Sequence, residues 1–178
     1  MDAKTHSRGQ MFSTEIILSF SLFMAALVVF LFVWNSLSNS YAEEQSDRRM
    51  EVSLLGIADM CVLSPGDPQD WEQLPAPQNA NAFGLASSRN VLSSSKLSAL
   101  QSLFTSDPAN TTMKMGAGGY GLFLEVTDTS GTVLYNFGQA ADASNTSISQ
   151  IGANRLAILD NDVVNVRVQV WRVKGQAI

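Results

Sequence analysis

The feature that most constrains this chain is an apolar run near its start. Residues 16–34 read IILSFSLFMAALVVFLFVW, without one charged side chain. As an α-helix rising 1.5 Å per residue they cover about 28 Å, close to the roughly 30 Å hydrocarbon core of a bilayer. A core helix usually carries a polar stripe, whereas only Ser19 and Ser21 interrupt this run. The sequence therefore predicts a membrane-spanning segment rather than a buried core helix.

The flanks of the run suggest that it is retained and predict its orientation. A secretory signal has an apolar region of about 7 to 15 residues before a small-x-small cleavage site, whereas this run is longer and ends in VWNSLSNS. Lys4 and Arg8 precede it, and the Glu43-Glu44 pair supplies the first charges after it. The positive-inside rule then places the N-terminus in the cytoplasm and the larger part outside, although the Arg48-Arg49 pair counts for the opposite orientation.

The rest of the composition excludes several classes of function. Lys plus Arg number 11 against 16 Asp plus Glu, for a net charge of -5 and no basic run, so we expect no nucleic-acid partner. The only histidine is His6, which excludes His-dependent hydrolysis and His-ligated zinc in everything that follows it. Cys61 has no intrachain disulfide partner and lies on an apolar stripe, which predicts a small buried residue rather than a reactive thiol. We expect no enzyme, no catalytic residue, no cofactor and no metal site.

Glu15 is a carboxylate at the edge of the apolar run. Placing an ionised acid deep in hydrocarbon costs several kcal/mol, so its position needs an account. One interpretation places it among headgroups, where it caps the helix start and the helix dipole favours an anion. The other places it inside an assembly, paired with a positive group of a neighbouring chain.

Arg8-Gly9-Gln10 followed by MFSTEIILSF resembles the class III signal peptide of archaeal type IV pilin-like proteins. The resemblance implies that a prepilin peptidase cleaves between Gly9 and Gln10 on the cytoplasmic side. The apolar helix is then kept as the stalk of a filament subunit, and Glu15 meets the freed N-terminal amine of the next subunit. Glu15 is the sixth residue counted from Gln10, whereas the family usually has the acid fifth, so cleavage after Gln10 is the alternative.

A second resemblance to the same family lies downstream, and the two together cover about residues 8–40 and 61–104. Related proteins often carry a Ser-Pro-Gly-x-Pro-x-x-Trp segment, then Gly-Leu-Ala, then a short helix opening with Lys-Leu. The matching residues here are Ser64-Pro65-Gly66-Asp67-Pro68-Gln69-Asp70-Trp71, Gly84-Leu85-Ala86 and Lys96-Leu97-Ser98-Ala99-Leu100.

The pattern and the resemblance predict an α+β, type IV pilin-like fold in which a long N-terminal hydrophobic helix packs on a small antiparallel sheet. Residues 1–9 form a cytoplasmic leader. Residues 10–63 form one helix, because no proline precedes Pro65 and apolar residues recur at helical spacing from Met50 to Cys61. Its membrane-spanning or filament-core half covers about residues 13–37. Residues 64–178 form an extracellular globular domain.

Within that domain the sequence predicts one short helix and four strands. Ser93, Ser94 and Ser95 offer N-caps for a helix of about nine residues that Asp107-Pro108 ends, with Leu97, Leu100 and Phe104 on one face. Residues 120–126, 132–137, 156–159 and 164–170 alternate or run apolar and read as antiparallel strands. We expect the second half of the long helix to cover their apolar face.

Several motifs have structural explanations that we prefer to functional ones. Gly116 to Gly121 matches GxGxxG, but a strand follows it rather than a helix, which favours a turn. Asp160-Asn161-Asp162 is a hairpin turn rather than a calcium loop, and the acidic cluster at residues 67, 70 and 72 is a solvated loop. Asn110 and Asn145 head N-x-Ser/Thr sequons in loop-like stretches, so both are possible N-glycosylation sites on an exported chain.

These observations favour a structural subunit of an archaeal type IV pilus-like cell-surface filament, a helical homo-oligomer built through its apolar helices for adhesion or appendage assembly. The expected partners are membrane lipid, identical or related pilin subunits and a prepilin peptidase. The alternatives are a minor or membrane-resident pilin-like adhesin, and a single-pass anchored binding or sensor protein that does not polymerise. The residue at the N-terminus of the mature chain distinguishes them.

Overall fold

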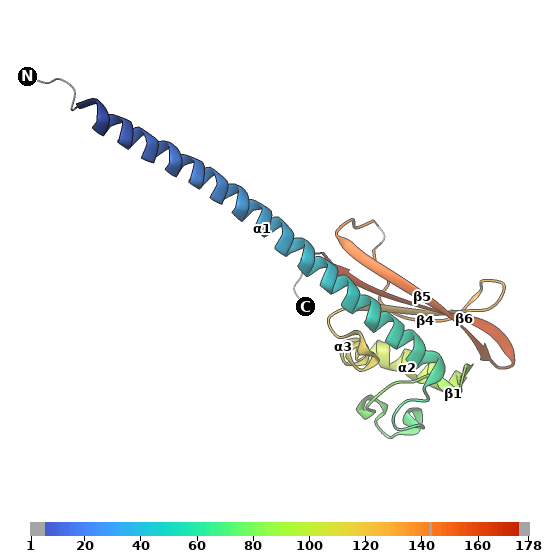
Figure 1. The fold of residues 1–178 in the computed structure, drawn as a ribbon. Coiled ribbons are helices and arrows are strands. Elements are labelled where there is room, and N and C mark those ends of the chain that lie inside the picture. Colours follow the sequence, from blue (N-terminus) through green and yellow to red (C-terminus); the bar gives the residue numbers. More distant parts are fainter. Residues whose placement is uncertain (1–5, 143, 175–178) are drawn as a thin grey trace, which may run out of the picture. The chain divides into compact units, whose positions relative to one another are not determined.

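The computed structural model describes residues 6–142 and 144–174, without the side chains of residues 6–13, 39, 40, 42 and 43. The chain forms two compact units, Met1–Ser46 and Asp47–Ile178, which we describe one at a time. Figure 1 labels the elements of both. We call the first the helical unit and the second the globular unit.

The long apolar N-terminal helix expected from the sequence is present. Helix α1 spans His6–Leu63, so it supplies the helical unit and also the first turns of the globular unit. It ends directly before Ser64-Pro65, because the residue that precedes a proline is disfavoured in the helical conformation. The backbone N–H of Ser64 still donates to the Met60 carbonyl at 3.1 Å, which closes the last turn.

The globular unit is built on one six-stranded sheet with the strand order β1-β2-β5-β6-β3-β4. Its strands are β1 (Ala86–Ser88), β2 (Val91–Leu92), β3 (Gly121–Thr127), β4 (Val133–Gly138), β5 (Ile148–Leu159) and β6 (Asp162–Val173). Every pairing is antiparallel except β2 with β5, which is parallel. The sheet is therefore mixed, and the expectation of a four-stranded antiparallel sheet was wrong in both respects.

Two features of the chain account for the difference. Strands β1 and β2 have only three and two residues and lie in a stretch rich in turn residues, so they carry no readable period. Strand β5 starts at Ile148 rather than at residue 156, because a continuous register with β6, from Ile148 opposite Val173 to Leu159 opposite Asp162, holds its first half in place. Gly152 and Asn154 break the alternation there.

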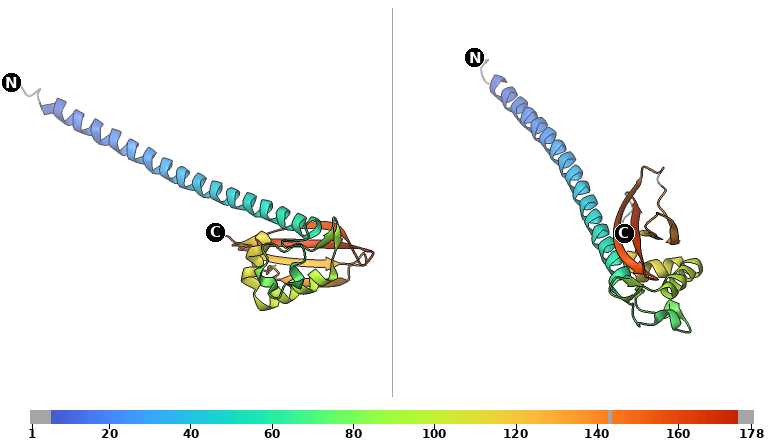
Figure 2. Two further views of the ribbon diagram at one scale, coloured as in Figure 1. Left: turned by 90° about the horizontal axis from the view of Figure 1, so that it is seen from below. Right: turned by 90° about the vertical axis from the view of Figure 1, so that its right-hand side faces the viewer.

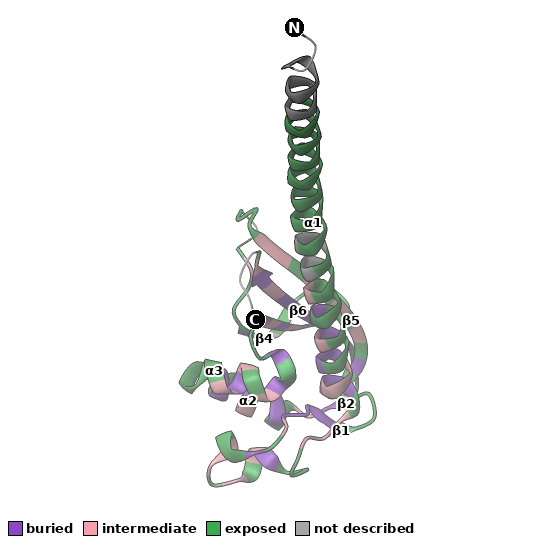
Figure 3. Ribbon diagram, turned by 60° about the vertical axis from the view of Figure 1, so that its left-hand side comes forward, coloured by how far each residue is buried: buried purple, intermediate pink, exposed green. Residues whose placement is uncertain are grey.

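One face of the sheet is covered by helices. Leu124 of β3 lies opposite Phe137 of β4 and opposite Val168 of β6, so these three side chains share a face, and all are buried. The buried side of α1 joins the same core through Met50, Leu54, Ile57, Ala58, Cys61 and Val62. Figure 3 shows buried positions on α1 and the strands of the globular unit, and in both views of Figure 2 the last turns of α1 run alongside the sheet.

Ion pairs and hydrogen bonds also join α1 to the rest of the globular unit, among them a bond from the Asn90 N–H to the Val62 carbonyl at 2.8 Å. Asp59 accepts from Arg155 of β5 at 2.9 Å, and Asp47 accepts from Arg172 of β6 at 2.9 Å. The Ser53 hydroxyl donates to the Gly116 carbonyl at 2.7 Å. Because the Asp59 and Asp47 side chains are about half exposed, burial of the apolar stripe contributes more to this packing than the charges do.

Helix α2 (Ser94–Ser106) has the N-cap, the stop at Asp107 and the buried face that the sequence predicts, but its 13 residues exceed the expected length of about nine. Ser93 is its N-cap and accepts from the Lys96 N–H at 3.5 Å, and Asp107 ends it. Phe104 packs on Phe137 of β4 with ring centroids 5.5 Å apart. Shorter elements complete the layer, namely α3 (Pro108–Thr112), the wide turn η3 (Met113–Ala117) and the 3-10 turns η1 (Trp71–Gln73) and η2 (Pro77–Asn79).

The two hairpin turns expected from the sequence are also present. Asp160 and Asn161 both adopt positive φ, at 52° and 73°, as a two-residue turn between β5 and β6 requires. Asp128 Oδ1 accepts from the Ser130 and Thr132 N–H groups, both at 2.8 Å, in the turn between β3 and β4. Both turns use short polar side chains that tolerate or stabilise tight backbone conformations.

Candidate functional site

The most distinctive surface in the helical unit is an uninterrupted apolar helix. Within Thr14–Ser38, a window of 18 residues has a mean hydropathy of 2.9, and none of the stretch is buried. At 1.5 Å per residue their helix is long enough to cross a bilayer, and it satisfies its own backbone hydrogen bonds, as a membrane span must. The hydroxyl of Ser21 donates to the Ile17 carbonyl at 2.8 Å, so even this polar group is satisfied within the helix.

Glu15 is the one charged residue within Thr14–Ser38, and it is exposed. Helix α1 begins at His6, so Glu15 lies about two and a half turns inside the helix of the full-length chain. The favourable effect of the helix dipole on an anion falls off within the first turn. The interpretation of Glu15 as a cap of the helix start therefore does not hold for the uncleaved chain.

The residues of the leader motif are only partly described. The backbone of Arg8, Gly9 and Gln10 belongs to α1, whereas their side chains and residues 1–5 lie outside the described part. The motif therefore remains a prediction from the sequence.

The segments of the downstream resemblance meet in the globular unit. Trp71 is fully buried, packs on Phe83 with centroids 5.0 Å apart, and donates its indole N–H to the Gly84 carbonyl at 2.8 Å. A Cβ on Gly84 would lie 2.1 Å from the Ser64 carbonyl oxygen, and one on Gly66 would lie 2.5 Å from the Trp71 ring. Both glycines are therefore required by close packing.

Lys96 joins these segments and is the main residue that sequence reasoning missed. Its side chain is 3% exposed, and its ammonium donates to the carbonyls of Pro65 at 2.6 Å, Gln69 at 2.8 Å and Ala86 at 3.1 Å. We call residues 64–86, together with Lys96, the clamped loop. A readable signal existed, because Lys96 shares a helix face with Leu100 and Leu103, where a solvated lysine would be out of place.

Burial lowers the pKa of Lys96, while the carboxylates of Glu72 and Asp70 act in the opposite direction. The acidic cluster is thus more than a solvated loop, because two of its members lie close enough to stabilise a buried cation. The third, Asp67, accepts from the Asn81 side-chain amide at 2.8 Å. A second lysine, Lys114, donates to the Ala80 carbonyl at 2.8 Å and to that of Gln78, and so holds the same loop from η3.

The two sequons lie in different surroundings. Asn145 is exposed in the connection between β4 and β5, whereas Asn110 is half-buried within α3. Gly116 to Gly121 begins within the last residues of η3 and ends on the first residue of β3, the reverse of the strand and helix order of a dinucleotide-binding motif.

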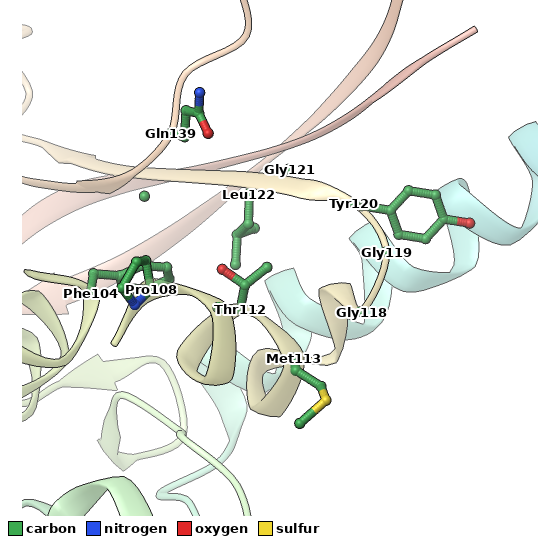
Figure 4. A pocket seen from close by; sticks show the side chains of 12 residues that line it. Phe104, Pro108, Thr112, Met113, Gly118, Gly119, Tyr120, Gly121, Leu122 and Gln139 are labelled. Atoms are coloured by element: carbon green, nitrogen blue, oxygen red, sulfur yellow. The ribbon is translucent and has the colours of Figure 1, made fainter. Parts of the chain in front are cut away.

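An open pocket of about 570 Å³ lies between the α2–α3 layer and the start of β3. Phe104, Pro108 and Thr112 line one side and glycine backbone lines the other, and Figure 4 shows the side chains of Met113 and Tyr120 turned away from it. The described lining residues include no carboxylate, amine, imidazole or thiol. Among the described residues, no group of three His, Cys, Asp or Glu is placed to hold a metal ion.

Comparisons with protein-family models, with curated proteins and with solved structures found no match for this chain. The resemblance to archaeal pilin-like proteins therefore rests on the sequence motifs.

Proposed function

We propose that this chain is a structural subunit of an archaeal type IV pilus-like cell-surface filament. In this proposal a prepilin peptidase removes the leader at Gly9, the apolar helix anchors the subunit in the membrane with the globular unit outside, and the helix then exchanges lipid for the helices of identical or related subunits. The observation that carries the proposal is the exposed apolar surface of Thr14–Ser38 with a single carboxylate inside it.

The physical argument concerns how that surface and that charge are accommodated. Apolar side chains exposed all around a helix need a nonpolar surrounding, which lipid or a bundle of like helices supplies. An ionised Glu15 in such a surrounding needs a positive partner. Cleavage before Gln10 creates one, because the new α-amino group of a neighbouring subunit would attract the carboxylate by about 4 kcal/mol at 4 Å and an effective dielectric constant of 20.

The globular unit supports a structural role as well. In the clamped loop, Lys96 and Trp71 donate to backbone carbonyls of the same loop. The described residues that line the pocket at the start of β3 include no acidic or basic side chain. A filament subunit requires a globular unit that remains folded in water while the apolar helix lies in a nonpolar surrounding.

The decisive measurement is the N-terminus of the chain recovered from cell-surface material, by mass spectrometry. Gln10 or Met11 at that end supports the proposal, and an intact Met1 would favour a solitary membrane anchor. Glu15→Gln should leave the globular unit folded and strongly reduce filament yield in electron micrographs. Glu51→Gln, at an exposed acid in the globular unit, is the matched control and should assemble normally. Normal filament yield from Glu15→Gln would refute the pairing role.

A further inference from the structure

The two sequons of the globular unit have different backbone conformations, and this difference decides which of them a transferase can use. We propose that Asn145 is N-glycosylated and that Asn110 is not. The donor would be a polyprenyl-phosphate-linked glycan at the outer face of the membrane. The proposal rests on the proposed function in one respect, because it requires the globular unit to be exported.

Asn145 presents its sequon in an exposed turn. Asn145 and Ser147 are both exposed, and the side-chain carbonyl oxygen of Asn145 accepts from the Ser147 N–H at 2.9 Å. The Asn145 carbonyl accepts from the Ile148 N–H at 3.1 Å, directly where β5 begins. The turn therefore engages the oxygen of the Asn145 side-chain amide, while the nitrogen that must react is not the atom in that bond.

Asn110 is held in the opposite way. It lies inside α3, and residues two apart in a helix point away from each other, so Asn110 and Thr112 cannot face one active site together. Asn110 is half-buried, its N–H donates to Asp107 Oδ1 at 3.2 Å, and the adjacent Thr111 is buried with its hydroxyl on the Asp107 carbonyl at 2.7 Å. Using this sequon would require α3 to unwind and Thr111 to leave the core.

The reaction is a substitution at the anomeric carbon of the donor. The Asn145 Nδ2 forms a bond to C1 of the first sugar, and the bond from C1 to the phosphate oxygen breaks. The polyprenyl phosphate leaves with that electron pair, and Nδ2 gives up one proton to a basic group of the transferase. No electrons are exchanged with another reactant.

The chain offers an internal control for this geometry. Asp128 Oδ1 accepts from the Ser130 N–H at 2.8 Å, in the same side-chain-to-backbone turn that Asn145 forms. Asp128-Thr129-Ser130 becomes an N-x-Ser sequon through the single change Asp128→Asn, and an asparagine oxygen can accept the same bond. Asp128→Asn therefore creates a sequon of like turn conformation elsewhere on the globular unit, with a half-buried asparagine and an exposed Ser130.

The test is intact-mass measurement and peptide mapping of the chain isolated from membranes of its own cells. We expect the wild-type mass to exceed, by one glycan located on Asn145, the mass calculated for the sequence from its observed N-terminus. Asn145→Gln and Ser147→Ala should each lose it, Asn110→Gln should retain it, and Asp128→Asn should gain a second. Asn145 and Ser147 are both exposed and lie outside the core, so we expect Asn145→Gln and Ser147→Ala to fold normally. Loss of the glycan from these variants would therefore not be a result of misfolding.

Other outcomes overturn the proposal. An unmodified wild-type chain, or a glycan on Asn110, refutes it. Protease treatment of intact cells then distinguishes failure of the glycosylation proposal from failure of the proposed export of the globular unit. If the globular unit is digested from outside while Asn145 is unmodified, the glycosylation proposal fails alone. If the globular unit is protected, its export fails as well, and with it the orientation in the proposed function.

Discussion

The clamped loop makes a quantitative prediction for Lys96→Met. Methionine keeps most of the apolar stem of lysine and removes the ammonium, so the change tests the hydrogen bonds rather than the packing. Three backbone carbonyls, those of Pro65, Gln69 and Ala86, then lose their donor.

The expected loss follows from how far each carbonyl is buried. The bond to Ala86 is buried, and an unsatisfied buried acceptor costs about 1–3 kcal/mol. The bonds to Pro65 and Gln69 are part-buried, so water can replace the donor at a cost of about 1 kcal/mol each. Methionine also removes the cost of burying a charge, the same cost that lowers the pKa of Lys96, and this gain offsets part of the sum. The three costs add to about 3–5 kcal/mol before this offset, so we expect the free energy of unfolding to fall by about 2–4 kcal/mol, a large part of the 5–15 kcal/mol of a typical domain.

The assay is urea unfolding of the full-length chain in detergent, followed by tryptophan fluorescence. Trp71 is fully buried in the clamped loop and reports on it directly. Lys174→Met, at an exposed lysine, is the matched control and should change the free energy of unfolding by less than about 0.5 kcal/mol. A Lys96→Met chain as stable as this control would show that the three carbonyls do not depend on the ammonium.

Two further predictions concern close packing and burial. Gly84→Ala should destabilise the globular unit by about 1–3 kcal/mol in the same assay, because its Cβ would meet the Ser64 carbonyl oxygen at 2.1 Å; an unchanged midpoint would contradict this. Burial raises the pKa of Cys61 from 9.0 to about 12, so the folded chain should resist iodoacetamide at about pH 9 and react fully in urea. The pKa of Cys61 is higher in the folded chain than in the unfolded chain. The contribution of the neutral buried thiol to folding stability is therefore complete below pH 9.0 and is lost as pH rises toward about 12. Rapid alkylation of the folded chain would refute the burial argument.

The contacts of the clamped loop also give a physical reason for the downstream resemblance. Trp71, Gly84 and Lys96 come from three separate segments and meet through two sets of side-chain-to-backbone hydrogen bonds. Each bond ends on a backbone carbonyl, so the segments depend on one another's backbone position more than on one another's side chains. The residues of the motif accordingly determine how this loop folds.

Elements defined by local chemistry were predictable. The start of α2 at Ser93, its end at Asp107 and the turn at Asp160-Asn161 each depend on residues within a few positions of one another. Elements defined by distant partners were not predictable. The parallel pairing of Val91 with Ile158 joins residues far apart in the sequence, and no sequence pattern near either residue predicts it.

The candidate sites divide along the same line. Asn110 and Asn145 are equivalent as sequons, and only the tertiary structure separates a helical one from one in an exposed turn. Glu15 stands out in the sequence as the lone charge of an apolar run, but the start of α1 at His6 shows that the full-length helix does not present it as a cap.

The sequence by itself determined the apolar helix of Thr14–Ser38, the helical period of its continuation and the hairpin of β5 and β6, because hydrophobic periodicity and turn chemistry act between near neighbours. Only the tertiary structure decided which backbone carbonyls accept from Lys96, that the sheet is mixed and that the two sequons differ. Those outcomes depend on which distant backbone groups come within hydrogen-bonding reach once the core has formed, and no local pattern encodes that distance.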